Sequence, residues 1–239
     1  MSQQSRSSRF LRLFLAAATL SLSACASHTA TGDSVYDPFE PLNRTVYGLN
    51  EAADILLIGP AATIYREGVP QPVQTRVRYA VQNLELPVIA ANKLLQGNFE
   101  GTGTAVGRFA VNSTLGVLGI FDVATDWGMP YEKTDFGVTL ASWGLEEGPY
   151  LFLPLVGPSN LRDGVGRGVD MFGDPVRWAT KDNDGRLFYY VANALRAIDA
   201  RGGADAVIND ARTNSLDSYA TLRSYYSQHR ASEVEAQTR

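Results

Sequence analysis

The amino-acid sequence predicts an all-α fold built of many short helices. Apolar residues recur at a spacing of three to four over several segments, and this period is typical of amphipathic helices. Prolines divide the middle of the chain into short elements, and regular alternation of apolar and polar residues over the length of a strand is scarce. A β-sandwich is therefore not supported.

The first 24 residues have the three zones of a secretory signal peptide. Arg6, Arg9 and Arg12 form a basic start, an apolar stretch runs from Leu13 to Leu22, and small residues follow. The apolar stretch is too short to serve as a membrane-spanning helix. We therefore expect residues 1–24 to be removed on export.

The apolar stretch leads into the sequence of a bacterial lipobox. Leu22, Ser23 and Ala24 directly precede Cys25, the only cysteine of the sequence. In a lipobox the thiol is alkylated by a diacylglycerol, and cleavage occurs just before the cysteine. A single cysteine has no intramolecular disulfide partner, which favours lipidation of Cys25 over the alternative of an ordinary signal peptide.

Residues 25–34 are expected to form a lipidated tether, because most of them are small or polar. Ala26 is not the Asp that retains many lipoproteins on the inner membrane, so the periplasmic side of the outer membrane is the expected location. The predicted leader holds three Arg and no acid, so its removal changes the formal net charge from −4 to −7. An acidic chain without a basic cluster is a poor candidate for binding nucleic acid, and no such partner is expected.

Residues 35–228 are expected to form a single helical domain. Pro72 stands at a first-turn position before a stripe of apolar residues. A second stripe follows Asp184, which is placed to cap a helix, and ends before Gly202; a third lies near the C-terminus. The three stripes consist of Val73, Val77, Val81 and Leu84, of Leu187, Tyr190, Val191, Ala194, Leu195 and Ile198, and of Leu216, Tyr219, Ala220 and Tyr226. Residues 229–239 lack such a period and are expected to be a disordered tail.

No apolar run after the predicted leader reaches the roughly 18 residues of a membrane-spanning helix. The segments Ile55–Ile58, Leu115–Phe121 and Tyr150–Val156 are nevertheless apolar. Two interpretations of these segments remain open. They form the core of the protein, or they belong to a monotopic protein whose short helices lie within one leaflet of a bilayer.

The predicted helical domain, residues 35–228, contains no histidine. His28 falls in the tether and His229 in the tail, and the sequence has no other histidine. Ser-His-Asp and Cys-His mechanisms and His/Cys zinc sites are therefore nearly excluded, and no catalytic residue, metal or cofactor is expected. A hydrolase with paired carboxylates remains as a minor alternative. Its candidate acids are Asp122, Asp126, Glu146 and Glu147.

Ordered sequence motifs cover most of residues 37–175. They include Asp37-Pro38-Phe39-Glu40-Pro41-Leu42-Asn43-Arg44, Arg108-Phe109-Ala110-Val111-Asn112-Ser113-Thr114-Leu115-Gly116 followed by Asp122, Gly148-Pro149-Tyr150, and Gly157-Pro158-Ser159 leading to Arg162-Asp163. Together these motifs resemble those of the VacJ/MlaA lipoproteins, a family that takes part in maintaining the lipid asymmetry of the Gram-negative outer membrane.

The resemblance implies a ring-like arrangement of short amphipathic helices, monotopic in the inner leaflet of the outer membrane, around a polar channel. A phospholipid misplaced in the outer leaflet would pass through this channel to a soluble periplasmic lipid carrier. Family members also associate with trimeric outer-membrane porins. The implied function is phospholipid transport without enzymatic activity; the alternative is a structural or scaffolding lipoprotein that docks on a porin.

Candidates for lining or gating such a channel are Arg108, Asn112, Arg162, Asp163 and Gly164. The first two are four residues apart on an otherwise apolar helix, so they share a face that would line a groove. Alternatively, Arg108 forms a structural ion pair with Asp122. The glycines that begin at Gly164 permit either a moving gate or close helix packing.

Overall fold

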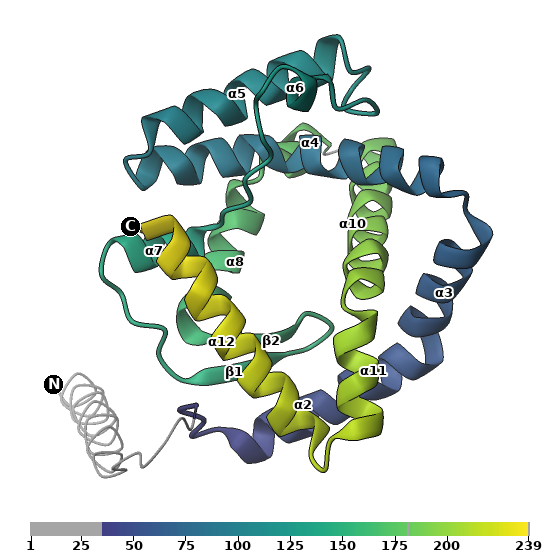
Figure 1. Ribbon diagram of the computed structural model, residues 1–239, viewed down its shortest axis with the longest axis vertical. Helices are drawn as coiled ribbons and strands as arrows, with labels where there is room; N and C mark the ends of the chain where they lie inside the picture. The colour runs from purple at the N-terminus through teal and green to yellow at the C-terminus, as the bar shows by residue number, and fades with distance from the viewer. Residues whose placement is uncertain (1–34, 181, 239) are drawn as a thin grey trace, which may run out of the picture. The chain divides into compact units, whose positions relative to one another are not determined.

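The computed structural model describes residues 35–180 and 182–238. The predicted signal peptide, the lipobox residues Leu22, Ser23 and Ala24, and Cys25 with its tether lie outside the described residues. The elements of the described part (Figure 1) are α2 (Glu40–Ala53), the π-helix η2 (Asp54–Ile58), α3 (Gly59–Gly68), α4 (Gln71–Leu95), α5 (Phe99–Thr114), α6 (Val123–Asp126), α7 (Phe136–Ser142), β1 (Tyr150–Leu153), β2 (Gly157–Asn160), α8 (Leu161–Gly173), α9 (Pro175–Ala179), α10 (Asn183–Gly203), α11 (Asp205–Asn214) and α12 (Ser218–Thr238). The predicted all-α fold is confirmed, with one short hairpin added to it.

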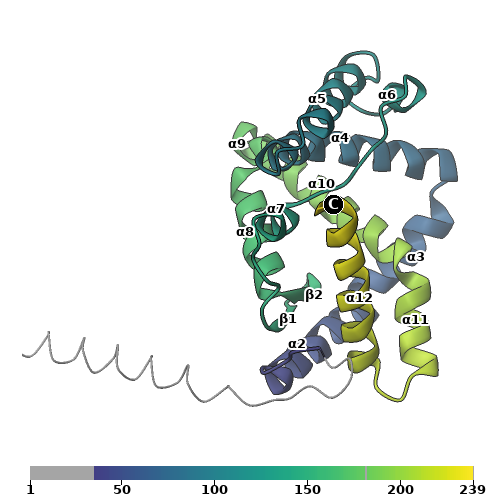
Figure 2. The same cartoon turned by 60° about the vertical axis from the view of Figure 1, so that its left-hand side comes forward.

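The elements of the described part follow one another around a ring (Figure 1). α2 and α3 form one side of this ring, and α4 and α5 run side by side across the next. α7, α8 and the β-hairpin lie on the side opposite α3, while α10 and α11 lie along the inside of α3 and α2. Figure 2 shows α5 stacked against α4 and α12 returning past the hairpin toward α7. The ring-like arrangement implied by the resemblance is therefore present.

The pair α4 and α5 contains a small apolar core. Leu86 and Ile89 of α4 pack against Ala105 of α5, and all three side chains are buried. Pro72 lies in the first turn of α4, as its position in the sequence predicts. Asn98 caps α5, because its side-chain oxygen accepts a hydrogen bond from the backbone N–H of Gly101 at 2.7 Å.

The segment Tyr150–Val156 forms part of the β-hairpin and is not helical. β1 and β2 pair antiparallel, with Tyr150 opposite Asn160 and Leu153 opposite Gly157. Tyr150 and Phe152 point to one side of the strand and are buried in an aromatic cluster with Tyr219 of α12. Tyr150 and Phe152 are core residues, as the first interpretation expects, but they belong to a strand. Leu155 and Val156 of the same segment are exposed.

Two boundaries differ from those that the sequence predicts. α10 begins at Asn183 with Asp182 at the N-cap position, so the predicted cap residue Asp184 lies inside the helix. The prediction of a disordered tail from His229 is wrong for residues 229–238, which continue α12 to Thr238. The physical reason is that Arg230 is buried in ion pairs with residues of α7 and α8, a contact that local periodicity does not reveal.

None of the helices within the described ranges is both long enough and apolar enough to cross a bilayer.

Candidate functional site

Large apolar side chains are exposed over much of the described surface. Leu56 of η2, Phe99 of α5 and Leu118 in the loop after α5 each have more than 70% of their surface accessible to solvent. A soluble monomer rarely exposes apolar patches beyond a few hundred Å², so side chains of this number and size mark a surface that contacts a partner or a membrane. Further exposed examples are Ile55, Leu57, Ile64, Val117, Trp127, Leu155, Val165, Phe172, Leu187 and Tyr190.

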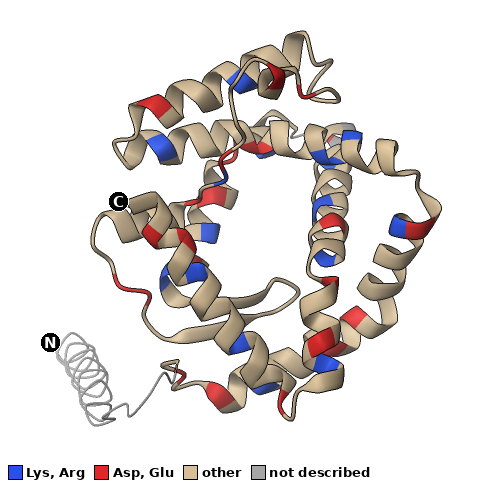
Figure 3. Cartoon of the chain, in the orientation of Figure 1, with Lys and Arg blue, Asp and Glu red and all other residues tan. Residues whose placement is uncertain are grey.

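Charged residues are instead distributed along the helices of the ring (Figure 3), and many of them pair within the protein. Four polar clusters connect different elements of the described chain, and three of the four join elements that are distant in sequence. Three of them contain residues that the sequence analysis singles out, and the fourth contains arginines that it missed.

The first cluster forms the corner between α5 and α6. Arg108 and Asn112 are 2% and 3% exposed, and both bind the carboxylate of Asp122, at 2.9 and 3.0 Å. Arg108 also donates to Thr125 and to the backbone carbonyl of Met129. The predicted common face of Arg108 and Asn112 is confirmed, and the structure contains the Arg108–Asp122 ion pair that the sequence left as an alternative.

The surroundings of Asp122 in this corner lower its pKa. Burial by itself raises the pKa of Asp122, but hydrogen bonds from Thr125, Asn112 and Arg108 outweigh burial, so the pKa lies below the usual value of an aspartic acid. Asp122 therefore carries its negative charge at neutral pH and is engaged in holding the corner. An acid with a lowered pKa and occupied oxygens has the properties of a structural ion pair rather than those of a general acid.

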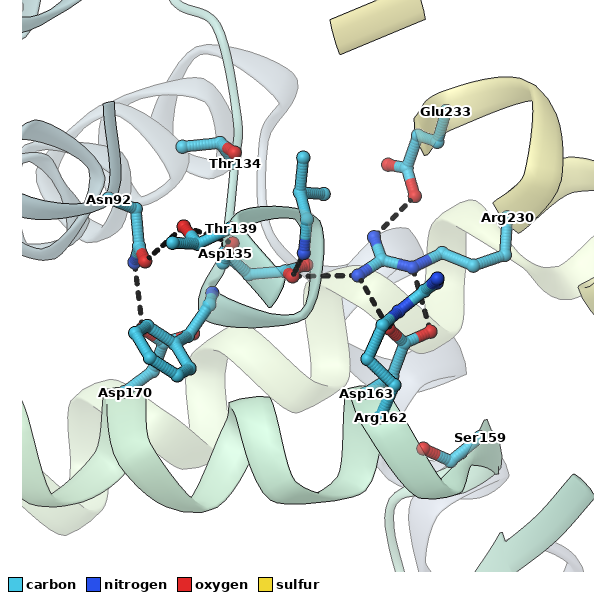
Figure 4. A network of polar contacts seen from close by, with 12 residues as sticks. Asn92, Thr134, Asp135, Thr139, Ser159, Arg162, Asp163, Asp170, Arg230 and Glu233 are labelled. Atoms are coloured by element: carbon cyan, nitrogen blue, oxygen red, sulfur yellow. Dashed lines mark hydrogen bonds and ion pairs between the residues drawn. The ribbon is translucent and has the colours of Figure 1, made fainter. Parts of the chain in front are cut away.

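The second cluster joins α7, α8 and α12 (Figure 4). The side chain of Asp163 is 2% exposed and accepts two hydrogen bonds from Arg230 of α12, at 2.8 and 3.1 Å. Tyr226 donates to Asp163 at 2.6 Å, and Arg162 lies at 3.2 Å from the same carboxylate. Arg230 continues to Asp135 at the start of α7, at 2.6 Å.

Burial and pairing act against each other in this second cluster. Burial raises the pKa of Asp163, but the hydrogen bonds from Arg230 and Tyr226 more than compensate, so its pKa is lowered. For Arg230, burial lowers the pKa, and the bonds to Asp163 and Asp135 reverse that effect and raise it. Both groups are charged at neutral pH, and each offsets the cost of burying the other's charge.

The glycines of α8 differ in their surroundings. A Cβ atom at Gly166 would overlap the backbone of Gly137 in α7, whereas one at Gly164 would meet only Ser159 and Leu153 at ordinary contact distances of 3.9 and 4.0 Å. Close helix packing therefore explains Gly166. It does not explain Gly164, the residue predicted as part of a gate.

The third cluster gathers the first and last parts of the described chain. Asp37 accepts hydrogen bonds from Asn43 at 2.8 Å, from Arg223 at 2.8 Å and from the hydroxyl of Tyr219. Asn43 in turn bridges the backbone of β1, donating to the carbonyl of Tyr150 at 3.1 Å and accepting from the N–H of Phe152 at 2.8 Å. The motif residues Asp37, Asn43 and Tyr150 thus meet and fasten α2 to the hairpin and α12.

The remaining motif residues have more local surroundings. Arg44 pairs with Glu40 at 2.8 Å and with Asp217 at 2.6 Å, and all three side chains are about 40% exposed. Pro38 lies in the turn before α2 and Pro149 directly before β1. Phe109 is exposed on α5, and Gly116 lies so close to the backbone of Asn112 and Phe121 that no side chain fits there.

The fourth cluster was not predicted from the sequence. Asp54, the first residue of the π-helix, binds Arg201 of α10 at 2.7 Å and Arg212 of α11 at 2.6 Å. Burial raises the pKa of Asp54, but the hydrogen bonds of the two arginines lower it overall. A polar cavity of about 280 Å³ lies beside these groups. The partners are 147 and 158 positions away from Asp54, so no local spacing announces the contact.

The other acids of the hydrolase alternative do not join these clusters. Asp126 is exposed in α6, and Glu146 and Glu147 are exposed in the loop before β1. Among the described residues, no group of three His, Cys, Asp or Glu side chains is arranged to hold a metal ion.

Comparisons with known proteins agree with one another. The sequence model of the family described as "MlaA lipoprotein" matches residues 35–233. The chain is 36% identical to an uncharacterized protein of Rickettsia felis, over 85% of this chain and 79% of the other. It is 35% identical to the intermembrane phospholipid transport system lipoprotein MlaA of Escherichia coli, over 70% of this chain and 68% of that protein.

A solved structure described as "Structural basis for maintenance of bacterial outer membrane lipid asymmetry" has a similar fold. Its TM-score to this chain is 0.70 at 28% sequence identity, and the match covers 83% of this chain and 98% of the other. The similarity therefore extends over most of this chain and nearly all of the other.

Proposed function

Because the chain belongs to the MlaA lipoprotein family and takes part in intermembrane phospholipid transport, we propose that it removes misplaced phospholipids from the outer leaflet of the outer membrane and passes them to a soluble periplasmic carrier. It performs this task from the inner leaflet, anchored by acyl chains on Cys25 and docked on a trimeric porin. It binds lipid and makes or breaks no covalent bond.

The observation that carries this proposal is the combination of an apolar exterior with a ring of helices, none of which can span a bilayer in the described part. Exposed Leu, Ile, Val and aromatic side chains are stable among acyl chains, whereas in water they would promote association. A protein of this kind lies within one leaflet. This placement would put the ring at the depth where lipid headgroups must be moved.

The ring supplies a physical reason for transport. A headgroup that crosses hydrocarbon loses its hydration, and a polar passage replaces those lost contacts while the acyl chains stay in apolar surroundings. We propose that Arg108, Asn112, Arg162 and Asp163 support such a passage by holding the helices in place, because their polar groups are engaged in the two buried clusters. Gly164 remains the candidate for a moving element.

The proposal is tested by deleting the gene and measuring phospholipid on the cell surface with a membrane-impermeant amine reagent. The labelled phosphatidylethanolamine should rise severalfold in the deletion strain and return to the original level when the full-length protein is restored. Unchanged surface labelling would contradict the proposal.

The scaffolding alternative makes a different prediction. A scaffold would still capture the porin from detergent extracts, but it would carry no phospholipid through purification. Mass spectrometry of lipid extracted from the purified, lipidated protein therefore separates the two functions. We expect non-covalently bound phospholipid in that extract.

A further inference from the structure

The loop between α5 and α6, residues 115–121, is an apolar tip. Its exposed side chains include Leu115, Val117, Leu118 and Phe121, and that of Leu118 is 75% exposed. No charged residue occurs between Arg108 and Asp122, and this loop carries no charge colour in Figure 3. Surface loops are usually polar because water solvates them, so an exposed loop of this composition indicates a non-aqueous contact.

The backbone of the tip is strained. Val117 and Leu118 have φ angles of 52° and 58°, in the left-handed region that non-glycine residues rarely adopt. Such a conformation persists only where the surrounding structure enforces it. The strain turns two large apolar side chains outward at consecutive positions, and a relaxed loop would be free to fold them back.

Hydrogen bonds and close contacts enforce this conformation. The N–H groups of Leu118 and Gly119 donate to the carbonyls of Ser113 and Asn112, at 3.1 and 2.8 Å, and that of Phe121 donates to Gly116 at 2.9 Å. A Cβ atom at Gly119 would overlap the side chain of Asn83 in α4. The buried Arg108–Asn112–Asp122 corner lies directly at the base of the loop, so the tip is preformed.

The base of the tip also carries a cation. The guanidinium of Arg76 in α4 lies over the ring of Phe121, 4.4 Å from its centroid. Arg76 forms no ion pair with any carboxylate of the described residues, whereas several other arginines of the ring do. Trp127, 59% exposed, follows just after α6. Arginine and tryptophan are residue types that occur where the headgroups and the acyl chains of a leaflet meet, and here both occur close in sequence or space to an apolar projection.

We propose that residues 115–121 are a rigid wedge that inserts among phospholipid acyl chains, with Arg76 at the level of the lipid phosphates. The proposal rests on the proposed function and adds to it a specific point of contact with the bilayer. The charge complementarity between Arg76 and phosphate favours lipid over an apolar protein partner. Because the tip is preformed, insertion requires no ordering of the loop.

Site-specific fluorescence in the full-length, lipidated protein tests the wedge. Acylation uses the only native thiol, so Leu118→Cys supplies a single site for an environment-sensitive nitrobenzoxadiazole label. The matched control is Leu216→Cys, since Leu216 is fully exposed in the loop between α11 and α12 and is followed by Asp217. Vesicles of phosphatidylethanolamine and anionic phosphatidylglycerol, mixed at roughly 3:1, serve as the probe, because anionic lipid attracts a basic residue near the surface.

On addition of vesicles, the label at residue 118 should shift to the blue and brighten roughly threefold, and acyl-chain spin labels should quench it. The emission of the label at residue 216 should remain as it was before vesicles were added, because this label stays in water. A label at residue 118 that stays accessible to iodide on vesicle-bound protein would overturn the proposal. So would a label that is already shielded without lipid, which would mean that protein covers the tip.

Two further measurements keep the outcome clear. Val117→Cys provides a second label site with the same expected result, in case Leu118→Cys fails to fold by circular dichroism. Lipid transfer between donor and acceptor vesicles is measured with each labelled protein. A label in water on a protein that still transfers lipid refutes the wedge alone, whereas a buried label on a protein that transfers none refutes the proposed function alone.

Discussion

At the scale of single residues, buried charges decide which parts of this chain lie together. Asp163 is enclosed by Arg230, Tyr226 and Asn160, and Asp37 by Asn43, Tyr219 and Arg223. Each carboxylate is buried and would be costly without these donors. The arginine and tyrosine donors all come from α12, far away in sequence, so these pairs fix long-range contacts that apolar packing alone specifies less sharply.

Replacing Arg230 with Met should lower the free energy of unfolding by about 3–5 kcal/mol, because Asp163 would remain buried without its main cation. Urea unfolding followed by circular dichroism measures the change. The control is Arg78→Met: Arg78 forms a pair with Asp199 but is half exposed, so its loss should cost under about 1 kcal/mol. An equal loss of unfolding free energy in the two variants would mean that the buried ion pair stabilises the protein no more than the exposed one.

The stability of the fold should fall as the pH is lowered into the acid range. Asp54, Asp122 and Asp163 have pKa values below that of an unfolded aspartic acid, about 3.9. Their contribution is therefore fully present above pH 4 and is lost as the pH falls through their folded pKa values. Urea unfolding between pH 2 and pH 7 measures this loss. In Asp163→Asn the free energy of unfolding should depend less on pH below pH 4. An unchanged pH dependence would argue against a lowered pKa of Asp163.

At the scale of elements, local sequence explains where many helices begin, and packing explains where some continue. The side chains of Asn98, Asp122, Asp135, Asn160 and Asp174 accept hydrogen bonds from the first turns of the helices that follow them. α12 shows the other case, since its polar last turns are helical against α7 and α8 through Arg230. The hairpin likewise depends on Asn43, which satisfies backbone groups of β1.

The glycines of α8 provide a prediction for this scale. Gly166→Ala should destabilise the protein by about 1–3 kcal/mol, because its Cβ would overlap the backbone of Gly137. Gly164→Ala has room and should leave stability unchanged or raise it by up to about 1 kcal/mol, since alanine favours a helix. Thermal unfolding compares the two. A loss of lipid transfer in the stable Gly164→Ala protein would support a moving gate, whereas normal transfer would argue against one.

At the scale of the whole molecule, the distribution of apolar side chains is unusual for a soluble protein. The described residues bury small apolar clusters around Leu86 and around Tyr150, while many other large apolar side chains face outward. Folding therefore depends on polar clusters between elements, and the apolar exterior is left for the surroundings. Under the proposed function, a bilayer leaflet would cover that exterior, and the described residues contain no helix that could span the bilayer.

Cys25→Ala should release the protein from the membrane or misplace it, and should abolish transport. One acyl chain holds a protein only reversibly, whereas several chains hold it persistently, at about 0.8 kcal/mol per buried methylene. Fractionation of cells and surface labelling of phospholipid measure the two effects. Ser27→Ala, two residues beyond the thiol, is the control and should behave as wild type. Normal location and activity of Cys25→Ala would show that the anchor is dispensable.

Contacts between polar residues that are close in sequence could be predicted, whereas contacts between distant residues could not. The common face of Arg108 and Asn112 followed from their spacing, and the possible pair with Asp122 was evident from charge alone. The Asp54–Arg201–Arg212 cluster was not predictable, because charges separated by some 150 residues carry no periodic signal. The hairpin was missed because its strands are only four residues long.

Sequence by itself determined the class of the fold, the family and the expected lipid anchor, because helical periodicity, ordered motifs and a lipobox are local properties of a chain. Only the tertiary structure decided which charges are buried together, that the last helix extends to Thr238, and that residues 115–121 project as a rigid apolar tip. These features depend on atoms that meet across the ring. Their free energy arises from burial and pairing between distant segments, which no stretch of sequence contains by itself.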